Sequence, residues 1–283
     1  MNIKKYFAEY LLFPSLVLLI PLLGMLVYLR FEAPAALVSN LCIVGGGLII
    51  LIFEYQVPFN KDWNKDHGDT KTDILYAVVN ICVFAVIEVA ILFIAHRYFN
   101  FGLLKDFIRS ITNDSWFFEL LVFYLLVELL QYLHHRFSHA TNFLWRLHEI
   151  HHSLERLYSV NSLKIHAVEA LMRFGIPMVT LAVIGGSTQT MMVYSIQSSI
   201  VGLLQHGNIK MNLRFWNLIF STSDLHRVHH SANVAESKKN FGKTLALYDL
   251  LFGTYSKFEV SRIGNEQSIP KKYWKQLLFP FRK

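Results

Sequence analysis

The stretch YLLFPSLVLLIPLLGMLVYL, residues 10–29, contains no charged side chain. A helix needs about 20 residues to cross the hydrocarbon core of a bilayer, so this stretch is long enough to do so. Three further runs resemble it: residues 33–53 carry no charge, residues 74–95 carry one, and residues 115–133 carry only Glu119 and Glu128. The four runs predict four transmembrane helices.

The composition supports a membrane protein and indicates its orientation. Hydrophobic residues make up 53% of the chain and charged residues only 17%, against about 25% charged in soluble domains. The net charge is +7, and 18 of the 27 Lys and Arg residues follow His135. Because basic loops stay in the cytoplasm, we expect this half and the C-terminus to be cytoplasmic. No basic–aromatic module predicts nucleic-acid binding. The lack of an organelle signal favours a bacterial plasma membrane.

A fifth apolar run, residues 174–205, predicts a hairpin. It has no charge over 32 residues and contains Gly185-Gly186 near its middle. One straight crossing would separate His166 from His206 by about 30 Å of hydrocarbon, whereas a re-entrant or spanning hairpin returns both to one face. We therefore expect three parts: N-terminal transmembrane helices (1–114), a histidine-rich domain (115–260) and a basic amphipathic tail (261–283) suited to the membrane interface.

The histidines predict a metal site. Of the 13 histidines, 11 lie between residues 134 and 230, in the clusters HHRFSH (134–139), HEIHH (148–152) and HRVHH (226–230). Positions i, i+3 and i+4 share one face of a helix. Each triplet thus presents three imidazoles together, and His135 and His139 lie one turn apart, with His134 as the alternative to His135. Eight imidazoles exceed the roughly four ligands of one tetrahedral zinc, which predicts two metal ions.

The second cluster also fits a different chemistry. His148-Glu149-x-x-His152 is the signature of zinc metallopeptidases, in which Glu149 would act as general base. The third cluster has the same spacing but carries Arg227 where that signature needs its glutamate. The shared x-x-His-His spacing is therefore favoured, with Glu149 as a group that orients a ligand. A membrane-embedded zinc hydrolase remains the alternative.

Six ordered segments resemble the membrane fatty acid hydroxylase/sterol desaturase superfamily. They are HRFSH, LWRLHEIHHS, YSVNSLKIHAVE, QHGNI, STSDLHRVHHS and NFGKTLALYDLLFGTY. The resemblance implies an all-α membrane bundle of about four transmembrane helices plus the hairpin, with a cytoplasmic histidine-rich helical cap. It also implies a non-haem di-iron centre that uses O2 as cosubstrate to hydroxylate or desaturate a C–H position of a membrane lipid, such as a sterol, fatty acyl chain or ether lipid.

The resemblance further implies a set of site residues and a partner. The iron ligands carried over from it are His135, His139, His148, His151, His152, His166, His206, His226, His229 and His230. Glu149, Asn161, Glu169 and Asn208 are candidates for residues that support these ligands. Because the chain has no haem or iron–sulfur motif, we expect electrons from a separate electron-donor protein.

Overall fold

The described part of the chain is helical and contains no strand. The computed structural model describes residues 3–98, 104–265, 267 and 269–282, without the side chains of residues 88, 89 and 91–98. Within these ranges, five helices are long and apolar enough to cross a membrane: Ile3–Phe31, Ala35–Gln56, Thr70–Ile87, Trp116–Ala140 and Ala167–Ile184. The predicted all-α membrane bundle is confirmed.

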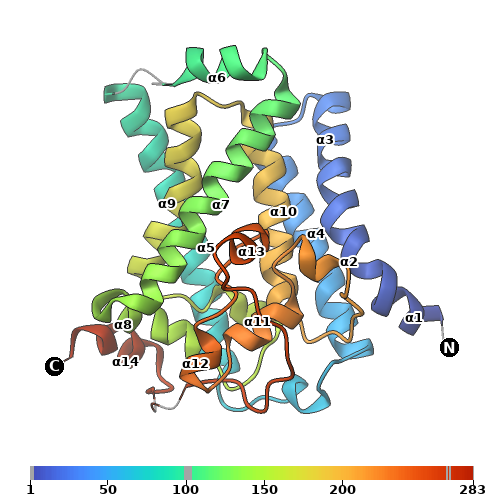
Figure 1. The fold of residues 1–283 in the computed structure, drawn as a ribbon, viewed down its shortest axis with the longest axis vertical. Coiled ribbons are helices and arrows are strands. Elements are labelled where there is room, and N and C mark those ends of the chain that lie inside the picture. The colour runs from blue at the N-terminus through green and yellow to red at the C-terminus, as the bar shows by residue number, and fades with distance from the viewer. Residues whose placement is uncertain (1–2, 99–103, 266, 268, 283) are drawn as a thin grey trace.

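The first of these helices is continuous but irregular. It comprises α1 (Ile3–Tyr6), η1 (Phe7–Leu11), α2 (Leu12–Pro14), η2 (Ser15–Leu19) and α3 (Ile20–Phe31). The two π-helical segments η1 and η2 lie on either side of the α2 turn that ends at Pro14. Proline lacks an amide hydrogen and interrupts the regular α-helical ladder. In Figure 1 the helix accordingly bends, and α1 leans away from the bundle.

The other long helices complete the bundle. They are α4 (Ala35–Gln56), α5 (Thr70–Tyr98), α7 (Trp116–Ala140), α9 (Ala167–Ile184) and α10 (Thr188–His206). The short α6 (Lys105–Thr112) lies across one end (Figure 1). The opposite end carries α8 (Asn142–His152), α11 (Ser223–His229), α12 (Val234–Ser237) and α14 (Tyr273–Leu278), whereas α13 (Leu247–Leu251) lies nearer the middle of the bundle (Figure 1). The other short helices are η3 (Lys61–Asn64), η4 (Ser159–Leu163), η5 (Trp216–Leu218) and η6 (Phe279–Phe281).

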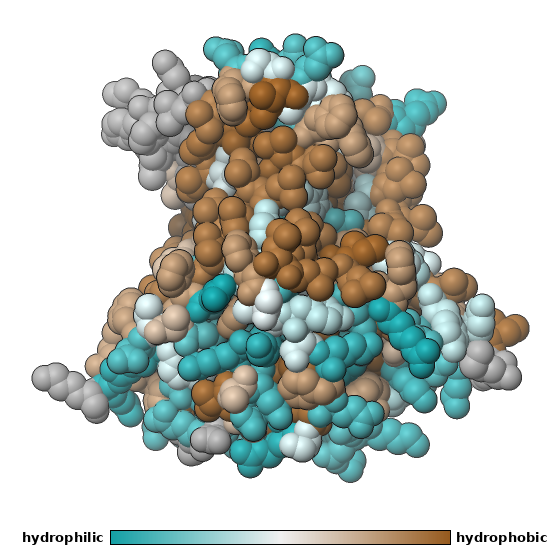
Figure 2. Space-filling view, viewed as in Figure 1, coloured by the Kyte–Doolittle hydropathy of each residue, from teal (hydrophilic) through white to brown (hydrophobic). Residues whose placement is uncertain are grey.

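The hydropathy of the surface follows this division. On the face that Figure 2 shows, a broad apolar band covers the long helices, with a thin polar rim at the α6 end and a larger polar cap at the other. The chain begins at the cap end, in α1, as Figure 1 shows. Lys4, Lys5 and the helices α8 and α11 that carry the two histidine triplets therefore lie at the same end of the bundle. That this end is cytoplasmic stays a prediction.

The predicted hairpin is formed by α9 and α10. Gly185 ends α9 in the left-handed region at φ 66°, and the Ser187 side chain accepts the Thr190 amide at the start of α10. A residue with a Cβ is strained at such a φ, so glycine suits this turn. Because the chain turns here, His166 before α9 and His206 at the end of α10 return to the cap.

Close packing holds α10 against the first two spanning helices. Ile196 and Ile200 are fully buried there. A Cβ on Gly24 would lie 2.8 Å from Ile196 Cδ1, and a Cβ on Gly46 would overlap Ile200 Cδ1. The absence of a side chain at both glycines thus lets the helices approach. This contact positions His206, which is the last residue of α10.

Candidate metal centre

Nine of the ten histidines predicted as ligands come together in two groups. Group A contains five: His135, His139, His148, His152 and His229. Group B contains four: His151, His206, His226 and His230. Within each group the ligand atoms lie within 4.8 Å of one another, and every residue is buried. Such convergence of buried imidazole nitrogens is typical of transition-metal sites.

The two triplets are divided between the groups. In α8, His148 and His152 belong to group A, whereas His151 belongs to group B. In α11 and its C-cap, His229 belongs to group A, whereas His226 and His230 belong to group B. Each triplet therefore contributes to both groups, and the two groups lie side by side between α8 and α11.

The spacing of the nitrogens supports metal binding. In group A the His148 Nε2 atom lies 3.0 Å from His135 Nε2 and 3.1 Å from His152 Nε2. In group B the His226 Nε2 atom lies 3.0 Å from His206 Nε2 and 3.1 Å from His230 Nε2. With metal–nitrogen bonds of about 2.1 Å, right-angled ligands lie about 3.0 Å apart and tetrahedral ligands about 3.4 Å apart. The observed spacings are short enough for neighbouring nitrogens to bind one ion.

The other ring nitrogen of most ligands is held by a hydrogen bond. The Nδ1 atom donates to Phe241 O in His135 (2.8 Å), Glu169 Oε1 in His148 (2.7 Å), Lys164 O in His151 (3.1 Å), Asn161 Oδ1 in His206 (2.8 Å) and Lys239 O in His229 (2.8 Å). A proton fixed on Nδ1 leaves the Nε2 lone pair free for a metal. In His139 the buried Nε2 has no hydrogen-bond partner, so it too is free for a metal.

Burial keeps these imidazoles neutral. It lowers the pKa of His151, His152, His226 and His230 well below the usual range, and the pKa of His229 to about 3. Neighbouring histidines add to the effect in each case, because two charged rings would repel. Neutral imidazole is the form that binds a metal, so these residues are ready to bind at neutral pH without losing a proton.

Glu169 supports group A directly. Its Oε1 atom accepts the His148 hydrogen bond and lies 3.6 Å from Arg173 Nη1. Both charged residues lie within the spanning helix α9, where such groups are costly and commonly functional. The carboxylate orients the His148 ring and makes its Nε2 a stronger donor.

Replacing Glu169 with glutamine should weaken metal binding by about 10–100-fold, because His148 loses its charged partner. The affinity is measured by titrating the metal-free protein with Fe²⁺ without oxygen. Glu155→Gln is the matched control, because Glu155 is an exposed carboxylate of the nearby loop. Equal affinity in the two variants would contradict a role for Glu169.

The other predicted residues have different positions. Asn161 contacts His206, as described above. Asn208 does not face a histidine: its side chain bonds with Asn60 and Asn64 and so holds the loop after α4. The Glu149 carboxylate accepts a hydrogen bond of 2.7 Å from Asn265. Glu149 thus lies beside the C-terminal segment rather than over the metal groups.

Two histidines that the sequence left open lie outside both groups. His166 caps α9: its Nδ1 accepts the Val168 amide (3.2 Å), and its Nε2 donates to Leu277 O (3.1 Å). Both of its ring nitrogens are therefore engaged. His134 is directed away from group A, as expected from its position about 100° around the helix from His135.

Residues 241–245 form a short segment that we call the strap. Its Phe241 carbonyl accepts the hydrogen bond of His135. Asp249 accepts the amides of Phe241 and Gly242, each at 2.7 Å. Glu128, inside α7, accepts the amides of Thr244 (2.7 Å) and Leu245 (2.9 Å). The two carboxylates thus fix the strap, whose Phe241 carbonyl binds His135. The sequence indicated Glu128 as a carboxylate within a spanning run, on the same helix face as His135.

Glu54 likewise fixes backbone segments that neighbour group B. The sequence alone did not identify it. Its carboxylate accepts the Ser159 amide and hydroxyl (2.7 and 2.8 Å) and the Asn208 amide (2.9 Å). These contacts tie η4, which carries Asn161, to the segment after His206. The available signal was a carboxylate at the end of an apolar run.

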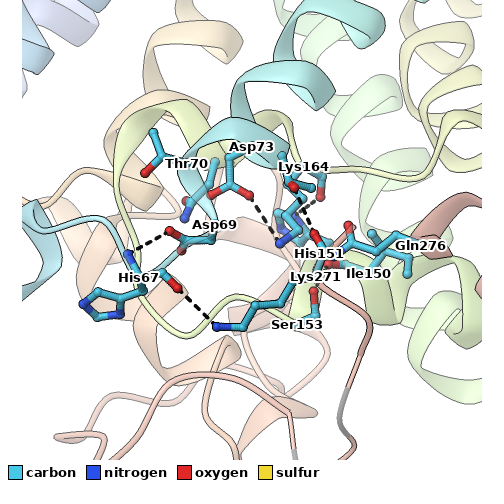
Figure 3. Close-up of polar contacts among 12 residues, drawn as sticks. His67, Asp69, Thr70, Asp73, Ile150, His151, Ser153, Lys164, Lys271 and Gln276 are labelled. Atoms are coloured by element: carbon cyan, nitrogen blue, oxygen red, sulfur yellow. Dashed lines mark hydrogen bonds and ion pairs between the residues drawn. The ribbon is translucent and has the colours of Figure 1, made fainter. Parts of the chain in front are cut away.

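An ion pair and two hydrogen bonds connect segments of the cap next to group B. Figure 3 shows His151 bonded to the Lys164 carbonyl, and the Lys164 ammonium 3.3 Å from Asp73 Oδ1. It also shows Lys271 of the C-terminal segment donating to the His67 carbonyl (3.1 Å). The tail is thereby attached to the loop before α5, on the cap.

Comparisons with known proteins agree with this site. Residues 120–254, which include all nine grouped histidines, match the family model described as fatty acid hydroxylase. The chain is 29% identical over 245 residues to ornithine lipid hydroxylase OlsE of Rhizobium tropici, covering 82% of this chain and 72% of that protein. No solved structure matches the chain significantly.

Alkylglycerol monooxygenases are similar over a shorter region. The human protein is 31% identical over 127 residues, which is 44% of this chain and 27% of that protein. The Caenorhabditis elegans protein is 28% identical over 136 residues, which is 45% of this chain and 25% of that protein. The chain thus spans about a quarter of these relatives, in the region of the histidine clusters.

Proposed function

We propose that the chain, whose residues 120–254 form a fatty acid hydroxylase domain of the membrane fatty acid hydroxylase superfamily, is an O2-dependent hydroxylase of a membrane lipid with two non-haem iron ions. The observation that carries this proposal is the pair of buried histidine groups. Two separate groups of five and four imidazoles have the capacity for two ions that act on one substrate. Hydroxylation is favoured over desaturation because the named relatives are a hydroxylase and a monooxygenase.

The proposed metal is iron rather than zinc. Nitrogen spacings of 3.0–3.2 Å fit right-angled ligands, and a nitrogen-rich site with open positions suits iron. Group A would hold one ion through His135, His139, His148, His152 and His229, and group B the other through His151, His206, His226 and His230. When bound, the irons supply the activation of O2 for attack on an unactivated C–H bond.

The protein's own residues position the reaction. The groups include His135 and His139 in the last turns of α7 and His206 at the end of α10, and both helices end at the cap (Figure 1). A lipid that remains in the bilayer would therefore place a carbon near its headgroup, rather than the end of its acyl chain, at the metals. We propose an amphipathic lipid with a polar headgroup as the substrate, as the names of the relatives suggest. Burial of the nine imidazoles excludes bulk water from the centre.

The proposed reaction also needs an electron donor, and the position of the cap limits where that donor can bind. The sequence has no haem or iron–sulfur motif, and we propose that electrons come from a separate donor protein. We propose that the cap faces the cytoplasm of a bacterial cell, because it carries most of the basic residues. The donor is therefore a cytoplasmic or membrane-associated protein.

Exchange of Glu149 for glutamine distinguishes this proposal from a zinc hydrolase. We expect Glu149→Gln to retain about two irons per chain and most of its lipid hydroxylation, since Glu149 contacts Asn265. Elemental mass spectrometry of the purified protein gives the metals, and mass spectrometry of the membrane lipids gives a product heavier by one oxygen atom. One zinc per chain, with activity lost in Glu149→Gln, would instead identify a hydrolase.

A further inference from the structure

The C-terminal segment lies at the boundary between the spanning helices and the cap. In the first turn of α5, the Thr72 hydroxyl donates to the Lys271 carbonyl at 2.9 Å. At the start of α9, His166 donates to the Leu277 carbonyl at 3.1 Å. Because α5 and α9 are spanning helices, these contacts hold the segment at the level where both helices begin, and Figure 1 shows α14 there, beside α8. We call residues 271–282 the anchor.

One face of the anchor is packed on the protein. Tyr273 is buried, and its ring contacts the ring of Tyr76 in α5, with centroids 4.7 Å apart. These two tyrosines form one buried cluster with Ile150 of α8. Ile150 directly precedes His151 in the chain. The anchor therefore packs on a helix that carries one of the two histidine triplets.

The other face of the anchor carries exposed apolar side chains. Trp274 is 72% exposed, Leu278 56% and Phe281 57%. The anchor is helical from Tyr273 to Phe281, through α14 and η6, and spacings of four and three residues place these three side chains in one stripe. A helix with such a stripe lies in the boundary between lipid headgroups and acyl chains, where tryptophan is enriched.

Basic side chains accompany the stripe. Residues 271–282 contain no acidic residue and four basic ones, which are all exposed: Lys271, Lys272, Lys275 and Arg282. A basic amphipathic helix is attracted to anionic lipid headgroups. Since the anchor lies where two spanning helices begin, the bilayer is the surface that its apolar stripe and its charges can reach together.

We propose that the anchor binds anionic lipids of the leaflet next to the cap and thereby fastens α8 and the start of α9 to the membrane surface. The stripe of Trp274, Leu278 and Phe281 inserts below the headgroups, while the basic side chains contact lipid phosphates. The inner face keeps its contacts with Ile150 and His166. This lipid contact needs no metal and no O2, so it does not depend on the proposed function.

The test follows a fluorophore in the stripe of the full chain. Leu278→Cys, with Cys42→Ser and Cys82→Ser, carries an environment-sensitive dye. The protein is placed in lipid nanodiscs of phosphatidylcholine alone or of equal parts phosphatidylcholine and phosphatidylglycerol. Quenching of the dye by spin-labelled lipid should be at least about 2-fold stronger in the anionic discs at low salt, and the difference should shrink at high salt. Lys272→Glu/Lys275→Glu changes the charge of the anchor from +4 to 0 and should remove the difference.

The matched control is Lys238→Glu/Arg262→Glu, which reverses two exposed basic side chains outside the anchor. It should keep the response to anionic lipid. Equal quenching in the two kinds of disc, or an unchanged response in Lys272→Glu/Lys275→Glu, would overturn the proposal. So would a dye that becomes apolar as the protein concentration rises in detergent and that lipid-borne quenchers do not reach, because a second copy of the chain would then cover the stripe.

Discussion

Replacing His226 with alanine is expected to lower bound iron from about two to about one per chain and to abolish hydroxylation. His226 Nε2 lies 3.0 Å from His206 Nε2 and 3.1 Å from His230 Nε2, so its loss removes one of the four donors of group B. Group A keeps its five histidines and its ion. Because the two ions act jointly, activity should fall by at least about 10³-fold. Elemental analysis and lipid mass spectrometry on the same sample measure both effects.

His166→Ala is the matched control for this prediction. His166 caps α9 and contacts Leu277 O, so its replacement should cost about 1 kcal/mol of stability and leave both irons in place. If His226→Ala keeps two irons, or His166→Ala loses one, the assignment of ligands to the two groups is wrong. A zinc hydrolase that uses His148 and His152 would retain its metal without His226.

Gly242→Ala is expected to destabilise the protein and to weaken group A, although no histidine is changed. A Cβ at Gly242 would overlap the Leu245 carbonyl oxygen and lie 2.8 Å from Asp249 Oδ2. The strap must then move, which breaks the Asp249 contacts and shifts the Phe241 carbonyl away from His135. Such overpacking costs about 1–3 kcal/mol or more. Thermal unfolding in detergent gives the loss of stability, and Fe²⁺ titration gives the loss of affinity.

The control for this variant is Gly175→Ala in α9. A Cβ at Gly175 would have no atom within 4 Å, and alanine is favoured over glycine in a helix by about 1 kcal/mol. Gly175→Ala should therefore bind iron normally and unfold at the same or a higher temperature. Normal iron affinity in Gly242→Ala would show that His135 does not depend on the strap.

Features carried by single segments were predictable from the sequence. Each spanning helix contains a long apolar run with few charges, and the turn between α9 and α10 lies at Gly185, where a positive φ is needed. The faces of α8 and α11 follow from 3.6 residues per turn, so the histidines that share a face could be recognised without a structure. The resemblance added His206, which stands alone in the chain and has no local pattern.

The tertiary structure alone decided how the histidines are divided. The spacing along α8 places His148, His151 and His152 on one face of the helix. In the folded protein, where α8 packs near α11, His151 belongs to group B and the other two belong to group A. His166 fits the sequence pattern equally well, yet the C-terminal segment occupies its Nε2. These outcomes depend on elements that are distant in the chain, which no local periodicity encodes.

By itself, then, the sequence predicted the class of fold, the apolar runs of the spanning helices and most of the histidines that gather in the two groups, because hydropathy and helical spacing are properties of single segments. Only the tertiary structure decided which nitrogen meets which partner. The carbonyls of Phe241, Lys164 and Lys239 hold three of the ligands. Every residue has a backbone carbonyl, so the sequence does not indicate which carbonyl will bind a histidine. That contact forms only when folding brings the two groups together.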